Sequence, residues 1–168
     1  GRLGRLLITL MLINDGVLHS CLFYPSFQFK KNRSEYYRQL TSVRERGTYE
    51  EWIEFFCASL LESAKDSVGS LKSLVDLHNR STAAITENLG RTAANGQRLL
   101  SLLEEHPILD TAFIAARLDI GRSTASSLVK SFEELGILRP LDESRQRYRQ
   151  YGYEEYLSIL REDAEPIR

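Results

Sequence analysis

Residues 112–136 read AFIAARLDIGRSTASSLVKSFEELG, and this stretch decides the fold. Apolar residues recur at helical spacing on both sides of the short Ile120-Gly121 break, and Gly136 is a typical helix stop. Two helices joined by so short a turn are typical of a helix-turn-helix. The stretch therefore predicts two consecutive helices, the second of which begins just after Gly121.

The flanking segments extend this motif. Upstream, a leucine-rich segment predicts an earlier helix that ends at His106-Pro107. Downstream, a short apolar run, a polar turn and an aromatic run predict a β-hairpin, and one more helix follows. Three helices and then a hairpin are the order of a winged helix-turn-helix. The flanking elements are expected at residues 99–103, at 137–138 with 148–153, and at 154–161.

Small and polar residues from Gly90 to Gly96 predict a domain boundary. We expect one domain over residues 1–90 and the winged helix over residues 91–168. The first domain is expected to be all-helical, because apolar residues recur at helical spacing through most of it. Its helices are indicated by a buried apolar run at Leu6–Ile13, by capping patterns at Asn32 with Glu35 and at Thr48 with Glu51, and by a further long helix over residues 68–89.

Composition limits the function classes. The 168 residues carry a net charge of −1, so nothing indicates a polybasic tail. Cys21 and Cys57 are too few for a disulfide framework, no apolar run reaches the roughly 20 residues of a membrane helix, and no signal peptide is visible. We therefore expect a cytosolic protein without membrane contact. The three histidines are dispersed, with no catalytic triad or metal-ligand spacing around them.

The first five residues, Gly1-Arg2-Leu3-Gly4-Arg5, have the composition of a phosphate site at a helix start. They are similar to the end of the Fic-family motif, which runs from a histidine through Gly-Asn-Gly-Arg-x-Gly-Arg. The Phe29–Tyr37 segment, FKKNRSEYY, and the segment YEEWIEFF that starts at Tyr49 also resemble helices that follow this motif. The C-terminal winged helix is similar to that of the long type of Fic protein.

This resemblance implies a Fic-like helical end piece followed by the winged helix, in a mainly α chain. The parent protein would transfer AMP from ATP to a hydroxyl side chain of a target protein, with Mg²⁺. Gly1, Arg2, Gly4 and Arg5 would contact the ATP phosphates. The motif histidine and the metal ligand would precede Gly1, so this chain alone is expected to be inactive, with no catalytic residue, metal or cofactor of its own.

The winged helix predicts a DNA-binding surface at the start of its third helix and in its wing. The charge balance opposes this, because residues 96–168 hold 10 lysines and arginines against 13 aspartates and glutamates, a net charge of −3. DNA binding and protein contact are therefore both left open. The candidate DNA-binding residues are Arg122, Ser123, Thr124, Ser126, Ser127 and Lys130 on the helix, and Arg145, Arg147 and Arg149 in the wing.

Two alternatives to the transferase remain. The first is a winged-helix DNA-binding transcriptional regulator with a helical dimerisation or scaffold region and no enzymatic activity. The second is a helical interaction protein that uses the aromatic face around Trp52. A homodimer is left open in each case. The sequence upstream of Gly1 would separate the transferase from both alternatives, since only the transferase requires a His-Pro-Phe segment there.

Overall fold

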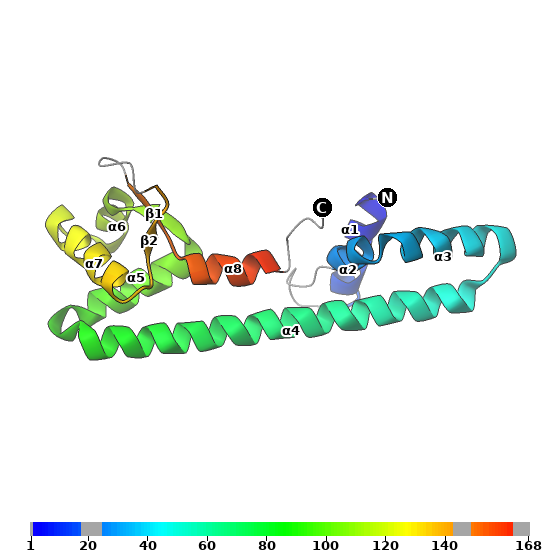
Figure 1. Ribbon diagram of the computed structural model, residues 1–168, viewed down its shortest axis with the longest axis horizontal. Coiled ribbons are helices and arrows are strands. Elements are labelled where there is room, and N and C mark those ends of the chain that lie inside the picture. The colour runs from blue at the N-terminus through cyan, green and yellow to red at the C-terminus, as the bar shows by residue number, and fades with distance from the viewer. Residues whose placement is uncertain (1, 18–24, 143–148, 163–168) are drawn as a thin grey trace. The chain divides into compact units, whose positions relative to one another are not determined.

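The computed structural model describes residues 2–17, 25–142 and 149–162 (Figure 1). The described chain is mainly helical with one small antiparallel sheet, which confirms the predicted fold class. It forms two compact units: unit 1 comprises Gly1–Lys72 with Glu162–Arg168, and unit 2 comprises Ser73–Arg161. The division between the two units falls after Lys72. The domain boundary predicted after residue 90 stays a prediction.

Unit 1 consists of helices. They are α1 (Arg2–Asn14), α2 (Pro25–Lys31), α3 (Arg33–Arg46) and the first part of α4 (Tyr49–Asn88). Gly47 ends α3 in the left-handed conformation, with φ 69°, and its N–H donates to the Val43 carbonyl at 2.9 Å. Glycine adopts this conformation without steric cost, so the chain can leave α3 and begin α4 two residues later.

Aromatic rings hold unit 1 together. Phe29 of α2 is 2% exposed, and its ring lies 5.4 Å from that of Tyr36 and 5.7 Å from that of Phe56. Trp52 packs against the same Tyr36 and Phe56 rings at 5.7 and 5.9 Å. Each such pair adds a fraction of a kcal/mol or more to the burial itself. The aromatic face predicted around Trp52 is therefore largely used inside unit 1.

Two expectations for this part of the chain are wrong. The apolar run Leu6–Ile13 does form a helix, but Leu6, Leu7, Leu10 and Met11 are each 50% exposed or more in the described chain, so it is not a buried core helix. The helix expected over residues 68–89 is not separate either, because α4 runs unbroken for 40 residues (Figure 1).

Unit 2 begins with the last part of α4 and contains the winged helix (Figure 1). Its three strands pair antiparallel in the order β1-β3-β2, with Ile108 and Arg139 on either side of Gly152. β1 was not predicted, and β2 lies just after the predicted run Ile137-Leu138, which is buried instead. The elements are η1 (Gly90–Thr92), α5 (Ala93–Glu105), β1 (Ile108–Asp110), α6 (Thr111–Leu118), α7 (Arg122–Glu134), β2 (Arg139–Pro140), β3 (Gln150–Gly152) and α8 (Glu154–Glu162).

An aliphatic core fills unit 2. Leucines of α5 pack with residues of α6, α7 and the sheet around Phe132, which is fully buried. Gly96 lets α5 approach α4 closely, because a Cβ there would lie 2.7 Å from a methyl carbon of Ile85 and 2.8 Å from one of Leu89. The end of α4 thus belongs to the same core as the winged helix.

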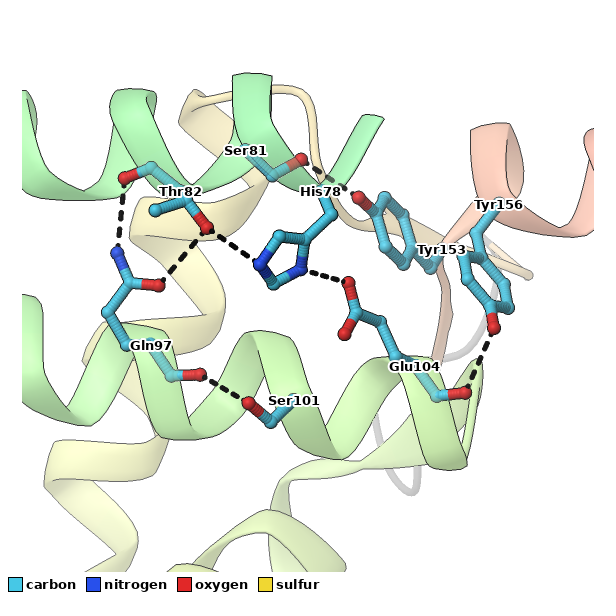
Figure 2. A network of polar contacts seen from close by, with 8 residues as sticks. All are labelled: His78, Ser81, Thr82, Gln97, Ser101, Glu104, Tyr153 and Tyr156. Atoms are coloured by element: carbon cyan, nitrogen blue, oxygen red, sulfur yellow. Dashed lines mark hydrogen bonds and ion pairs between the residues drawn. The ribbon is translucent and has the colours of Figure 1, made fainter. Parts of the chain in front are cut away.

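A polar network joins α4, α5 and the segment after β3 (Figure 2). The hydroxyls of Ser81 and Tyr153 share a buried hydrogen bond of 2.8 Å, and His78 Nδ1 lies 2.7 Å from Glu104 Oε1. Tyr156 donates to the Glu104 carbonyl at 3.2 Å, and its ring stacks on that of Tyr153. Burial raises the pKa of the Tyr153 phenol above its ordinary value of 10.0. These bonds fix α8 and the last turns of α4 against α5.

Candidate nucleic-acid interface

The turn between α6 and α7 is built by three local features. The Asp110 side chain caps α6 by accepting the Phe113 N–H at 2.7 Å. Asp119 ends α6 in the left-handed conformation, with φ 53°, which aspartate tolerates better than most residues. Gly121 then has extended backbone just before Arg122, the first residue of α7. Only three residues separate the two helices, as the sequence predicts.

α7 has one buried face and one exposed face. The buried face packs α7 against α6 and the rest of the core through Ala125, Leu128, Val129 and Phe132, none of them more than 3% exposed. Because a helix repeats every 3.6 residues, the residues between these positions face away from the core. The exposed side chains in the first part of α7 are Arg122, Ser123, Ser126, Ser127 and Lys130.

Five of the six helix residues predicted for DNA therefore share an exposed face. Thr124 is the exception, since it is half-buried beside the turn. Residues 122–130 contain two basic residues and no acidic one, although the winged helix as a whole is acidic. The exposed N–H groups at the start of α7 add a partial positive charge next to Arg122. This end of the helix is therefore suited to an anionic ligand.

The wing is only partly described. Arg145 and Arg147 lie outside the described residues, whereas Arg149 is half-buried at the foot of β3 and is engaged with other groups of the chain. Arg139 on β2 is exposed, and the sequence did not single it out. The sequence signal that could have identified it is its place directly after the apolar run Ile137-Leu138, at the start of the predicted hairpin.

Several neighbouring charges are already paired within the chain. Lys130 lies 3.7 Å from Glu134, and both side chains are strongly exposed, so this pair can open at little cost. Arg117 lies over the Phe113 ring and 3.9 Å from Glu105. Arg98 donates to the Leu118 carbonyl at 2.7 Å and so supports the end of α6. Arg98 is thus engaged within the motif, whereas the exposed Arg117–Glu105 pair contributes little to its stability.

The structure does not test the predicted phosphate site at Gly1, Arg2, Gly4 and Arg5. Gly1 lies outside the described residues, while Arg2, Gly4 and Arg5 belong to the first turn of α1 and their side chains are not described. Within the described ranges, no three His, Cys, Asp or Glu side chains come close enough together to hold a metal ion. The described residues also contain no helix long and apolar enough to cross a membrane.

The α6-turn-α7 pair, preceded by α5 and followed by the β2–β3 hairpin, defines a winged helix-turn-helix. Comparison with known families agrees: residues 92–142 match the IclR helix-turn-helix domain. The match begins in η1, covers the three helices and ends just after β2. It concerns this domain, which is less than a third of the chain.

The predicted Fic membership and AMP transfer are wrong. The family match is to the IclR helix-turn-helix domain, and no Fic match accompanies it. The physical weakness of that prediction lies in its evidence, because a five-residue phosphate pattern and general helical segments occur in many unrelated proteins. The expectation of ATP and Mg²⁺ depended on the same resemblance, and the described residues do not test it.

Proposed function

We propose that this chain is part of a DNA-binding transcription regulator, in which α7 enters the major groove of double-stranded DNA. The observation that carries the proposal is the exposed face of α7, which combines Arg122, Lys130 and three serines within a helix-turn-helix. Helices of this motif contact base edges with residues near their N-terminal ends. The IclR match over residues 92–142 supports the same function.

The exposed residues divide by the contacts that their chemistry allows. Arg122 can donate two parallel hydrogen bonds to a guanine edge, and the hydroxyls of Ser123, Ser126 and Ser127 can contact bases or phosphates. Lys130, two turns further along the helix, suits a phosphate. In the wing, Arg145, Arg147 and Arg149 are the proposed phosphate contacts, with Arg139 on the neighbouring strand. Thr124 is half-buried, so we assign it no DNA contact.

The acidic balance of the domain limits non-specific affinity. Non-specific binding depends on the number of phosphates neutralised, and each neutralised phosphate contributes about 0.9 to the slope of log K against log salt. A domain with net charge −3 gains little from long-range attraction to DNA. We therefore expect specific binding to depend on a few arginines and to be clear only at low or moderate salt.

Binding to selected DNA tests the proposal. The protein is incubated with random duplexes, bound sequences are enriched, and affinities are measured by fluorescence anisotropy over a range of salt concentrations. Arg122→Ala should change the preferred sequence and weaken the best site about 10- to 100-fold, as expected for a lost bidentate base contact. The control Arg44→Ala makes the same change in charge on exposed α3 of unit 1 and should have little effect.

A Lys130→Ala variant distinguishes phosphate contact from base reading. It should weaken all sequences by a similar factor and lower the salt slope by about one unit. No enrichment of any sequence, and no anisotropy change at tens of micromolar protein, would contradict DNA binding.

The acidic balance also supports a second candidate, in which the winged helix contacts another protein. Ile108 and Phe113 are exposed apolar side chains of this domain, at 43% and 37%, and protein interfaces commonly use such residues. This candidate expects no sequence-selective DNA binding. A wild type that selects no DNA sequence would favour it over the regulator.

A further inference from the structure

An exposed apolar stripe runs along α4 within unit 1. Leu61, Val68 and Leu71 are exposed at 56%, 50% and 43%, although α4 packs its opposite side against α2 and α3. Together with exposed Cys57 and half-buried Ala64, these residues lie on one side of the helix. We call Cys57, Leu61, Ala64, Val68 and Leu71 the α4 stripe.

The spacing of the α4 stripe is that of a coiled coil. Its members follow one another at intervals of four, three, four and three residues, which is the heptad repeat of positions that contact a second helix. A helix that merely faces solvent has no physical reason to keep this alternation. Ile53, 56% exposed, lies one turn before Cys57 and widens the apolar surface at that end.

The charges beside the α4 stripe are distributed unevenly along the helix. At its N-terminal end lie Glu50 and Glu54, and towards its C-terminal end lie Lys65 and Lys72, all four exposed. Glu54 precedes Cys57 by three residues and so occupies the preceding position of the heptad repeat, whereas Lys72 directly follows Leu71; the two are 18 residues, or five turns, apart. Lys65 is paired with Glu62 at 2.7 Å, so Glu54 and Lys72 are the opposite charges near the two ends of the stripe that a second helix could contact.

We propose that the α4 stripe pairs with the same stripe of a second copy of this chain, in antiparallel orientation. The antiparallel arrangement places Leu61 beside the second copy's Ala64 and Cys57 beside its Val68, so a larger side chain meets a smaller one in both pairs. Leu71 then lies at the end of the interface, near the second copy's Ile53 and Glu54. It also brings Glu54 of one copy next to Lys72 of the other, twice. A parallel arrangement would place the glutamates beside glutamates and the lysines beside lysines, which is unfavourable.

Self-association requires little reordering of the chain. α4 is already held as a helix by the aromatic contacts of unit 1, so the cost of forming a helix does not have to be met on binding. The stripe with Ile53 extends over about 30 Å of helix, which gives an interface at the small end of stable ones. We therefore expect association in the micromolar range.

Sedimentation equilibrium of the intact chain tests this surface. The wild type should dimerise with increasing concentration. Leu61→Lys should weaken the dimer by about 100-fold, because each of the two Leu61–Ala64 contacts would then bury an ammonium group. Val68→Lys should act similarly. The control Leu40→Lys makes a matched change at an exposed leucine of α3, outside the stripe, and should leave the dimer unchanged. Circular dichroism checks that each variant stays helical.

Disulfide cross-linking tests the orientation. In a Cys21→Ser background, Cys57 should not cross-link to the second copy's Cys57, since the two would be displaced by about 11 residues, or about 16 Å, along the antiparallel pair. Adding Val68→Cys should produce a cross-linked dimer under mild oxidation. Efficient Cys57 cross-linking without the added cysteine would overturn the antiparallel orientation.

Charge reversal provides an independent check. Glu54→Lys or Lys72→Glu alone should weaken the antiparallel dimer several-fold, and the two changes together should restore it. A wild type that stays monomeric at several hundred micromolar, or a dimer that is indifferent to both Leu61→Lys and Val68→Lys, would overturn the proposal. Neither result bears on DNA binding, which the anisotropy experiment measures separately.

Discussion

Units 1 and 2 use apolar residues in different ways. In the described part of unit 2, seventeen buried apolar side chains form one continuous core that joins α4, α5, α6, α7 and the sheet. Among the described residues of unit 1, Phe29 is the one large apolar side chain that is buried, and its neighbours Tyr36, Trp52, Phe55 and Phe56 are half-buried. Leucines and valines of α1 and α4 are instead exposed there.

This difference indicates different tasks. A core that buries its leucines completely can hold a helix-turn-helix in one geometry, which a DNA-reading surface requires. A unit that leaves long apolar stripes exposed has more surface suited to association. Unit 2 is thus the rigid reader in our proposal, and unit 1 provides the surface for a second copy. The comparison can be tested by changing matched residues in the two units.

The largest expected difference concerns the two cores. Phe132→Ala should destabilise unit 2 by about 3–5 kcal/mol, because Phe132 is 0% exposed at the centre of its core. Phe56→Ala in unit 1 should cost about 1–2 kcal/mol, because that ring is only half-buried.

Native-state hydrogen exchange by mass spectrometry measures each unit separately, which a single melting curve cannot do. Peptides from α5 and α7 should lose protection in Phe132→Ala, while peptides from α3 should not. Similar losses for the two variants, each within its own unit, would remove the distinction drawn between the cores.

Sequence reasoning predicted the helix-turn-helix well because its signals are local. The spacing of Ala125, Leu128, Val129 and Phe132, with Gly121 before them, determines both the helix and its exposed face. Five of six helix residues proposed for DNA accordingly lie on that face. Thr124 was predicted on the exposed face but is half-buried, because the apolar periodicity locates the edge of a helix face only to within about one position.

Non-local features were beyond reach. β1 has three residues, too few for an alternating pattern, and Ile108 pairs with Gly152 far along the chain. The sequence predicts two helices where α4 is unbroken; Gly69 lies where they would separate, but an interior glycine costs a helix only about 1 kcal/mol. The exposure of the α1 leucines depends on tertiary packing, which hydrophobicity alone does not specify.

Two glycines provide a test with opposite signs. Gly96→Ala should destabilise unit 2 by about 1–3 kcal/mol, because the new Cβ would lie 2.7 Å from Ile85 and 2.8 Å from Leu89, and α5 would be forced away from α4. Gly69→Ala should instead stabilise α4 by up to about 1 kcal/mol, since nothing lies within 4 Å of its added Cβ and the helix gains a better former.

Chemical denaturation, followed by circular dichroism and checked by hydrogen exchange, measures both glycine variants. A neutral Gly96→Ala would mean that α5 and α4 are packed less closely than the structure indicates. A destabilising Gly69→Ala would show that this part of α4 does not remain helical in solution.

The smallest expected effect concerns the Ser81–Tyr153 hydrogen bond. Tyr153→Phe should destabilise unit 2 by about 1 kcal/mol at neutral pH, because the hydroxyl of Ser81 loses its partner while the ring still fills the same space (Figure 2). Burial raises the pKa of the Tyr153 phenol above 10.0, so the folded state resists loss of that proton.

This shift has a definite sign in the pH dependence of stability. A group whose pKa is higher in the folded than in the unfolded state stabilises the fold below the unfolded value, and that stabilisation falls as pH rises towards the folded value. The wild type should thus lose stability above about pH 10, whereas Tyr153→Phe lacks this contribution. The stability difference between the two proteins should shrink from neutral pH to pH 11, as measured by urea denaturation at each pH. A difference that stays constant would mean that Tyr153 ionises as readily in the folded chain as in the unfolded one, and therefore that the hydroxyl is open to water rather than closed against Ser81.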